Sequence, residues 1–195
     1  MHRWCNKIGL TNEEIKNAFT FPKSCTLSVQ SIALQYKIST YTLPTGEYLW
    51  TYSVKDNYYC DRCLRATSNE PPERDNIIHS IFSCPRLQPF ITKVFHILIN
   101  DCKAVDHISQ IGYLLGFQEN EGLNCILLEV KKFIFYGYDP DKSVDIQISM
   151  LRNRLRRLII LEKKYYSTIN KWDYFFDKWE LFSDIYMAYG PDPYI

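Results

Sequence analysis

The sequence has no excess of charge of either sign. Its 195 residues include 23 lysines and arginines and 22 aspartates and glutamates, so the formal net charge is +1. A chain with this balance does not attract polyanions over its whole surface, and any nucleic-acid binding must come from a local patch. The sequence also has no apolar run that approaches the roughly 18 residues of a membrane span, and we expect no membrane partner.

Cysteine is present in an odd number, seven, and the first residues, Met1 to Lys7, lack the apolar stretch of a signal peptide. We therefore expect a reducing, intracellular location, in the cytoplasm, the nucleus or both. In such a compartment, two cysteines close in sequence form a metal site or a redox pair more often than a disulfide.

Apolar residues make up 46% of the chain, which is enough for a substantial core, and their spacing is mostly helical. Pro22 is expected to end a first helix that begins near Thr11. Segments 45–59, 64–76 and 109–122 are predicted to be connections or loops. We expect amphipathic helices over about 26–41, 85–100, 143–166 and 169–186, and a strongly apolar, central helix over 123–136.

Two short motifs supply a set of metal ligands. Cys60 and Cys63 place two thiolates on one tight turn, and His79 and Cys84 add an imidazole and a third thiolate near a predicted helix start. Three cysteines and one histidine form a common tetrahedral zinc site, and four protein ligands leave no open position for a catalytic water. The sequence therefore predicts a structural zinc ion bound by these four residues.

Two other interpretations of these residues stay open. A Cys-x2-Cys redox pair usually follows a strand in a thioredoxin-like setting, and the sequence shows no such pattern. The cysteines and the histidine can also be ordinary core residues, because free cysteine is among the most buried residue types. The fifteen residues between Cys63 and His79 make a long interval for a compact knuckle.

These observations together predict a mostly α fold, an irregular helical bundle with a small zinc-tied loop or knuckle region in the middle. We divide it into an N-terminal helical segment (1–50), the zinc-knuckle region with its following helix (51–102) and a C-terminal helical region (103–195).

The middle of the chain resembles the zinc-binding region near the C-terminus of LINE-type (non-LTR) retrotransposon reverse transcriptases. The similarity covers roughly residues 26–186. It is carried by Cys60-Asp61-Arg62-Cys63, by Ile78-His79-Ser80-Ile81-Phe82-Ser83-Cys84-Pro85 and by Phe90 and Val94, with weaker flanks at Leu34–Ile38, Leu123–Tyr136 and Trp179–Phe182.

This resemblance implies that Cys60, Cys63, His79 and Cys84 are the metal ligands and that the chain holds RNA or DNA for reverse transcription. The interval between Cys63 and His79 is longer than is usual in that family. No Asp-Asp pair occurs in the chain, whereas a polymerase needs paired aspartates for two metal ions. The resemblance therefore implies a C-terminal part without polymerase activity, whose partner is the polymerase portion of a longer parent protein.

A group of basic residues in the 143–166 helix is the best candidate for contact with phosphates. On a helix these residues lie away from the apolar stripe of Ile148, Leu151, Leu155 and Leu158, which suits a phosphate backbone. A solvated helix face is the other interpretation, and acidic neighbours such as Glu129, Glu162 and Asp145 can pair with the basic side chains. The candidate residues are Arg152, Arg154, Arg156, Arg157, Lys163 and Lys164, with Lys131 and Lys132 as a smaller second pair.

The aromatic residues of the last predicted helix, such as Trp172, Phe175 and Trp179, favour a core stripe over base stacking. The sequence thus predicts a non-catalytic, zinc-binding protein that binds RNA or single-stranded DNA. The alternative is a structural or protein–protein interaction module without nucleic-acid binding. A Cys-x2-Cys oxidoreductase is a distant third interpretation.

Overall fold

The structure is a computed structural model that describes residues 12–65, 71–117 and 120–182. Helices dominate these residues, which contain no strand and only one isolated antiparallel bridge, between Tyr59 and Arg74. The predicted mostly α fold with a Cys/His cluster in its middle is therefore confirmed.

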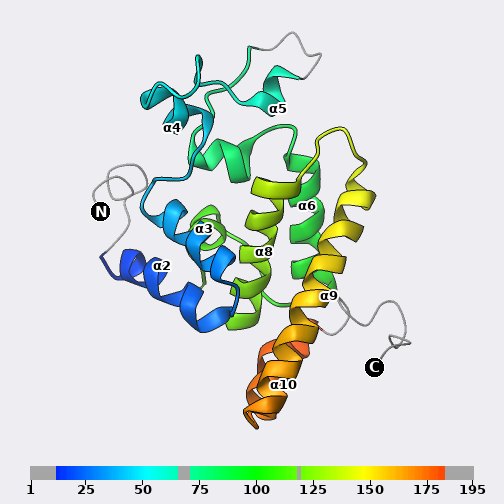
Figure 1. The fold of residues 1–195 in the computed structure, drawn as a ribbon. Coiled ribbons are helices and arrows are strands. Elements are labelled where there is room, and N and C mark those ends of the chain that lie inside the picture. Colours follow the sequence, from blue (N-terminus) through cyan, green and yellow to red (C-terminus); the bar gives the residue numbers. More distant parts are fainter. Residues whose placement is uncertain (1–11, 66–70, 118–119, 183–195) are drawn as a thin grey trace.

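The helices form a bundle with a smaller lobe at one end (Figure 1). The lobe contains the short helices α4 and α5, and the bundle is arranged around α8. In chain order the elements are α2 (Asn12–Cys25), α3 (Val29–Ser39), α4 (Gly46–Thr51), α5 (Asp61–Leu64), η1 (His79–Ser83), α6 (Gln88–His96), η2 (Ile97–Asp101), α7 (Gln110–Leu115), α8 (Glu121–Gly137), α9 (Val144–Thr168), α10 (Trp172–Trp179) and η3 (Glu180–Phe182).

Helix α8 is the centre of the bundle. The Asn120 side chain caps it by accepting a hydrogen bond from the Leu123 N–H, and most of the helix is then buried on every side. It contacts α2, α3, α9, α10 and η1. The prediction of a central apolar helix is thus confirmed, because a helix without a polar face is stable only when neighbours cover it all round.

The expectation that Lys131 and Lys132 of α8 form a second, smaller basic patch was wrong. Lys131 is only 1% exposed, and its Nζ donates to Gln35 Oε1 at 2.5 Å and to the Leu114 carbonyl at 3.2 Å. The rings of Phe21 and Tyr113 each lie 5.8 Å from the ammonium group. Its neighbour Lys132 pairs with Glu129 instead of facing solvent freely.

Burial lowers the pKa of Lys131 to about 7, whereas a lysine in an unfolded chain titrates near 10.4. Between these values the unfolded state binds more protons, so the free energy of unfolding rises with pH, by at most about 1.4 kcal/mol per unit. We expect denaturant titrations from pH 7 to 8.5 to show this rise in the wild type and a flatter profile in Lys131→Met. The neighbouring Cys25 thiol does not add to this pH dependence in the folded state. Burial raises its pKa to about 12, so it stays protonated from pH 7 to 8.5. If the free energy of unfolding rises equally with pH in both proteins, the lowered pKa of Lys131 is contradicted.

Helix α2 continues past Pro22 to Cys25, so the prediction that this proline ends the helix was wrong. A proline within a helix leaves the carbonyl four residues earlier without its usual N–H donor. Here that carbonyl belongs to Ala18, and the Ser39 hydroxyl of α3 donates to it at 3.3 Å. A side chain from the neighbouring helix thus replaces the missing hydrogen bond.

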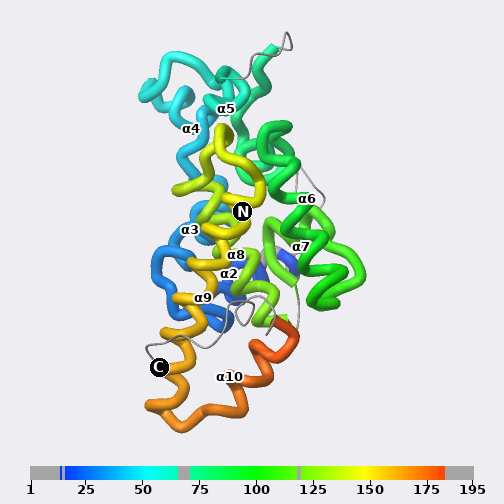
Figure 2. The backbone as a smooth tube through the Cα atoms, turned by 90° about the vertical axis from the view of Figure 1, so that its right-hand side faces the viewer, coloured from blue at the N-terminus to red at the C-terminus, as the bar shows by residue number. Residues whose placement is uncertain are grey.

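Helices α9 and α10 form a hairpin that extends away from the lobe (Figures 1 and 2). The Ser143 side chain caps α9, as predicted, and the buried side of α9 includes Leu151, Leu155 and Ile159. The hairpin is closed by a buried ion pair between Lys178 and Glu162, whose Nζ and Oε2 atoms are 2.5 Å apart. In α10, Phe175 and Trp179 are in the core as expected, whereas Phe176 is 56% exposed.

Candidate metal centre

Helix α5 brings the two sulfur atoms of the Cys-x2-Cys motif together. Cys60 is the N-cap of this four-residue helix and Cys63 lies within its single turn, where the Leu64 N–H donates to the Cys60 carbonyl at 2.9 Å. Residues three apart on a helical turn lie on the same side, so both thiols point in one direction. Cys60 is buried and Cys63 is half-buried.

The second pair of residues lies at the two ends of the π-helical turn η1. The Cys84 N–H donates to the His79 carbonyl at 3.0 Å, the i→i+5 bond that defines a π turn. This bond places residues five apart next to each other, which explains how a His-x4-Cys spacing can direct both side chains to one point. The Tyr113 hydroxyl of α7 donates to the Ile81 carbonyl at 3.1 Å and joins the turn to the bundle.

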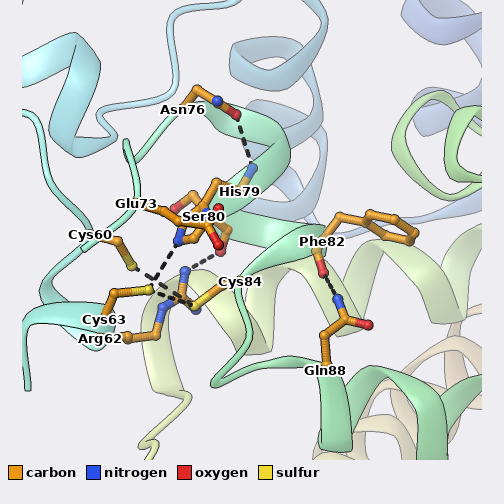
Figure 3. Close-up of polar contacts among 10 residues, drawn as sticks. All are labelled: Cys60, Arg62, Cys63, Glu73, Asn76, His79, Ser80, Phe82, Cys84 and Gln88. Carbon is orange, nitrogen blue, oxygen red and sulfur yellow. Dashed lines mark hydrogen bonds and ion pairs between the residues drawn. The ribbon is translucent and has the colours of Figure 1, made fainter. Parts of the chain in front are cut away.

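The four side chains converge, as the close-up shows (Figure 3). The Sγ atom of Cys84 is 3.9 Å from that of Cys60 and 3.7 Å from that of Cys63, and the Cys63 sulfur is 3.4 Å from His79 Nε2. All four ligand atoms lie within 4.8 Å of one another. Zinc–sulfur bonds of 2.3 Å in a tetrahedron place two sulfurs about 3.8 Å apart. The four residues could therefore bind a metal ion.

Backbone pairing brings the two motifs together across the long interval between them. The Cys60 N–H donates to the Glu73 carbonyl at 3.0 Å, and the Asp75 N–H donates to the Tyr58 carbonyl at 2.9 Å. These two bonds form a short antiparallel ladder just before each pair of candidate ligands. The ladder determines the distance between the motifs, so the fifteen-residue interval noted in the sequence does not disturb the cluster.

Two further side chains orient His79, and the sequence did not reveal either of them. Glu73 Oε2 lies 3.0 Å from His79 Nδ1, which leaves Nε2 facing the sulfurs, and Asn76 Oδ1 accepts from the His79 N–H at 2.9 Å (Figure 3). A carboxylate behind a histidine ligand fixes the orientation of the ring and makes it a stronger ligand. Because Glu73 lies in a polar segment with several similar residues, only the folded chain distinguishes it.

The electrostatics of the cluster favour negative charge on sulfur. The hydrogen bond from the Cys84 thiol lowers the pKa of Cys60 to about 2, despite the opposing effect of burial. The same bond, together with burial, raises the pKa of Cys84, while burial raises that of Cys63. Burial alone would lower the pKa of His79, but the hydrogen bond and the charge of Cys60 raise it on balance. A cation bound to all four residues takes the place of the shared protons.

The six basic residues predicted to contact phosphates all lie on α9, but their surroundings differ. The Arg154 guanidinium packs over the Phe133 ring at 5.0 Å, and Arg152 has its Nε atom buried. Arg156 is half-buried, whereas Arg157, Lys163 and Lys164 are exposed. The exposed part of the predicted patch is therefore its C-terminal half.

Two of the acidic neighbours have partners elsewhere. Glu162 pairs with Lys178, and Glu129 pairs with Lys132. Both contacts direct these carboxylates away from the basic residues of α9, so neither acid cancels the charge of the exposed patch.

No protein-family profile, curated protein or solved structure matches this chain. Within the described residues, no helix combines the length and the apolar character that crossing a bilayer requires.

Proposed function

We propose that this chain is a non-catalytic module that binds one structural zinc ion through Cys60, Cys63, His79 and Cys84, and that it binds RNA or single-stranded DNA. The convergence of three sulfurs and one imidazole nitrogen at tetrahedral distances supports the metal site most directly. A thiolate-rich set of this kind favours zinc over magnesium or calcium, which prefer oxygen ligands.

The composition of the cluster supports a structural site over a redox centre or an enzyme. A redox pair needs two cysteines, whereas here a third cysteine and a histidine contact the same pair. Four protein ligands also complete a tetrahedral shell, which leaves no position for a reacting water or substrate.

The test of the metal site is the mass of the purified protein under native and denaturing conditions, together with elemental analysis. We expect one zinc ion per chain that is lost on denaturation. An intact folded protein that contains no metal, and that does not take up zinc when it is supplied, would exclude the site.

Glu73→Gln should weaken zinc binding by roughly 10- to 100-fold, because the carboxylate orients His79 and strengthens it as a ligand. Competition with a chromophoric chelator measures this change. Asp61→Asn is the matched control, since Asp61 is an acid next to a ligand but contacts Lys55. The assignment of Glu73 fails if both variants retain wild-type affinity.

The nucleic-acid part of the proposal is supported by the exposed basic residues of α9 and by the resemblance to LINE-type reverse transcriptases. Arg157, Lys163 and Lys164 point to solvent on a helix whose other side is packed in the core. Such a ridge can follow a phosphate backbone without reading its sequence.

Replacing Arg157, Lys163 and Lys164 together by glutamine should weaken binding to all single-stranded sequences alike. It should also reduce the slope of log affinity against log salt by about 2, because each phosphate contact with a single strand releases roughly 0.7 counterions. Fluorescence anisotropy at several salt concentrations measures both effects. Changing the exposed Lys16, Lys23 and Lys37 of α2 and α3 to glutamine removes the same charge elsewhere and should have little effect.

A protein-interaction module is the second candidate function, and exposed apolar side chains on the hairpin favour it. Leu161 of α9 is 65% exposed and Phe176 of α10 is 56% exposed. If the affinity for nucleic acid changes neither with the triple substitution nor with the salt concentration, protein interaction becomes the better interpretation.

A further inference from the structure

Next to the metal cluster lies a group of aromatic rings that the proposed metal site does not use. The Trp50 ring is 5.3 Å from that of Tyr58 at an angle of 76°, and the Tyr58 ring is 4.6 Å from that of Tyr59. The Arg74 guanidinium lies 5.5 Å from the centre of the Tyr58 ring. We call these four residues the aromatic platform.

The platform is a surface feature rather than part of the core. Trp50 is 45% exposed, and both tyrosines are half-buried. An exposed tryptophan whose ring contacts Tyr58, which in turn contacts Tyr59, leaves a large apolar area in water that a structural role alone does not require.

The same backbone contacts that form the metal cluster hold the platform in place. Tyr58 and Tyr59 directly precede Cys60, and the Asp75 N–H donates to the Tyr58 carbonyl at 2.9 Å. Trp50 is held on α4, whose first residue, Gly46, donates its N–H to Asp75 Oδ2 at 2.6 Å. These contacts join α4, which carries Trp50, to the segment that leads into the metal cluster, so the platform and the cluster are held together.

The charges at the platform are largely paired. Arg74 is 3.0 Å from Glu47, and Lys55 is 2.7 Å from Asp61. A surface whose cations already have carboxylate partners attracts a phosphate backbone only weakly. What remains available is the π surface of the rings and the planar guanidinium, and both stack on nucleic-acid bases.

We propose that the aromatic platform binds unpaired bases of RNA or single-stranded DNA by stacking, with Trp50 as its main contact. This inference rests on the proposed nucleic-acid function and adds to it a second contact surface with different chemistry. The basic residues of α9 bind phosphates and depend on salt, whereas stacking on the platform requires bases and is nearly independent of salt. Base-paired strands hide their π faces, so the platform distinguishes single strands from duplexes.

The experiment compares three probes of one length: a single-stranded oligouridylate, an abasic deoxyribose-phosphate oligomer and a duplex. The proteins are the full chain, Trp50→Leu, which keeps an apolar side chain without a π system, and Trp50→Phe, which restores a ring. Anisotropy at high salt suppresses the phosphate contacts. Zinc content and melting temperature establish that each variant is folded.

We expect the wild type to bind the base-bearing single strand about ten-fold more tightly than the abasic oligomer or the duplex, which corresponds to stacking of one base. Trp50→Leu should lose this preference, and Trp50→Phe should keep most of it. Equal affinity of the wild type for the base-bearing and abasic strands would overturn the platform alone, and so would an unchanged preference in Trp50→Leu. If no probe binds, the proposed nucleic-acid function fails and the platform with it.

Discussion

Replacing Cys84 by serine is expected to release the metal ion and to loosen the lobe without unfolding the bundle. The variant loses one of the four metal ligands. The Cys84 sulfur lies within 3.9 Å of both other sulfurs, so its loss opens the coordination shell. Helix α8 contacts η1, but its contacts with α2, α3 and α9 and the contact between α2 and α3 do not involve the cluster. Hydrogen exchange should therefore increase strongly over about 46–65 and 71–87, while most of the far-ultraviolet helical signal remains.

The control for this substitution is Cys102→Ser, which changes a cysteine outside the metal cluster. It should keep its zinc and its slow exchange in the lobe. Loss of the entire helical signal in Cys84→Ser would contradict the prediction, because it would make the ion a requirement for global folding, as in an isolated zinc finger. The same measurement on wild-type protein with a strong chelator should reproduce the result for Cys84→Ser.

Breaking the buried ion pair of the hairpin should have the largest effect on global stability. Glu162 and Lys178 have side-chain exposures of 0% and 2%, and Lys178 also donates to the Cys25 carbonyl at 2.7 Å. Lys178→Met leaves the Glu162 carboxylate buried without its charge partner, although Trp179 Nε1 still donates to it at 3.0 Å. Removing one partner of such a pair costs about 3–5 kcal/mol. Chemical denaturation of the variant measures this loss.

A double substitution separates two contributions to the free energy of unfolding: the stabilisation by the ion pair itself, and the destabilisation that arises when one charge is left buried and unpaired. Glu162→Met with Lys178→Met removes both charges, and it should be less destabilising than Lys178→Met alone because no buried charge remains. Lys163→Met, one residue away on the exposed side of α9, should change the free energy of unfolding little. A double variant at least as unstable as the single one would show that packing, and not charge, holds the hairpin together.

The metal cluster could be predicted from the sequence because its ligands come in two local pairs. A Cys-x2-Cys turn and a His-x4-Cys turn each determine the relative position of two side chains, and residue type alone then indicates zinc. The four predicted residues do converge in the structure. What the spacing did not reveal was the π turn at His79, which accounts for the five-residue step, or the role of Glu73 behind the imidazole.

The helical bundle could be predicted from apolar periodicity, but individual interactions with distant residues could not. Lys131 follows the pattern of a surface lysine, and its burial is explained by Gln35, the Leu114 carbonyl and two rings from other helices. Pro22 stays within α2 because Ser39 of another helix supplies a donor. Residues 46–51, expected to lie in a connection, form α4, where the Thr45 side chain accepts from the Tyr48 N–H and Asp75 holds Gly46.

The position of Lys178 also bears on when the chain can fold as it is made. Its ammonium group reaches a carbonyl 153 residues earlier, at Cys25, and neutralises Glu162, which leaves the ribosome before it. Until Lys178 has been synthesised, packing α9 against its neighbours would bury the Glu162 carboxylate without a cation, which is strongly unfavourable. We therefore expect α9 to pack fully only after the second helix of the hairpin has been made, whereas α2, α3 and α8 can pack against one another earlier.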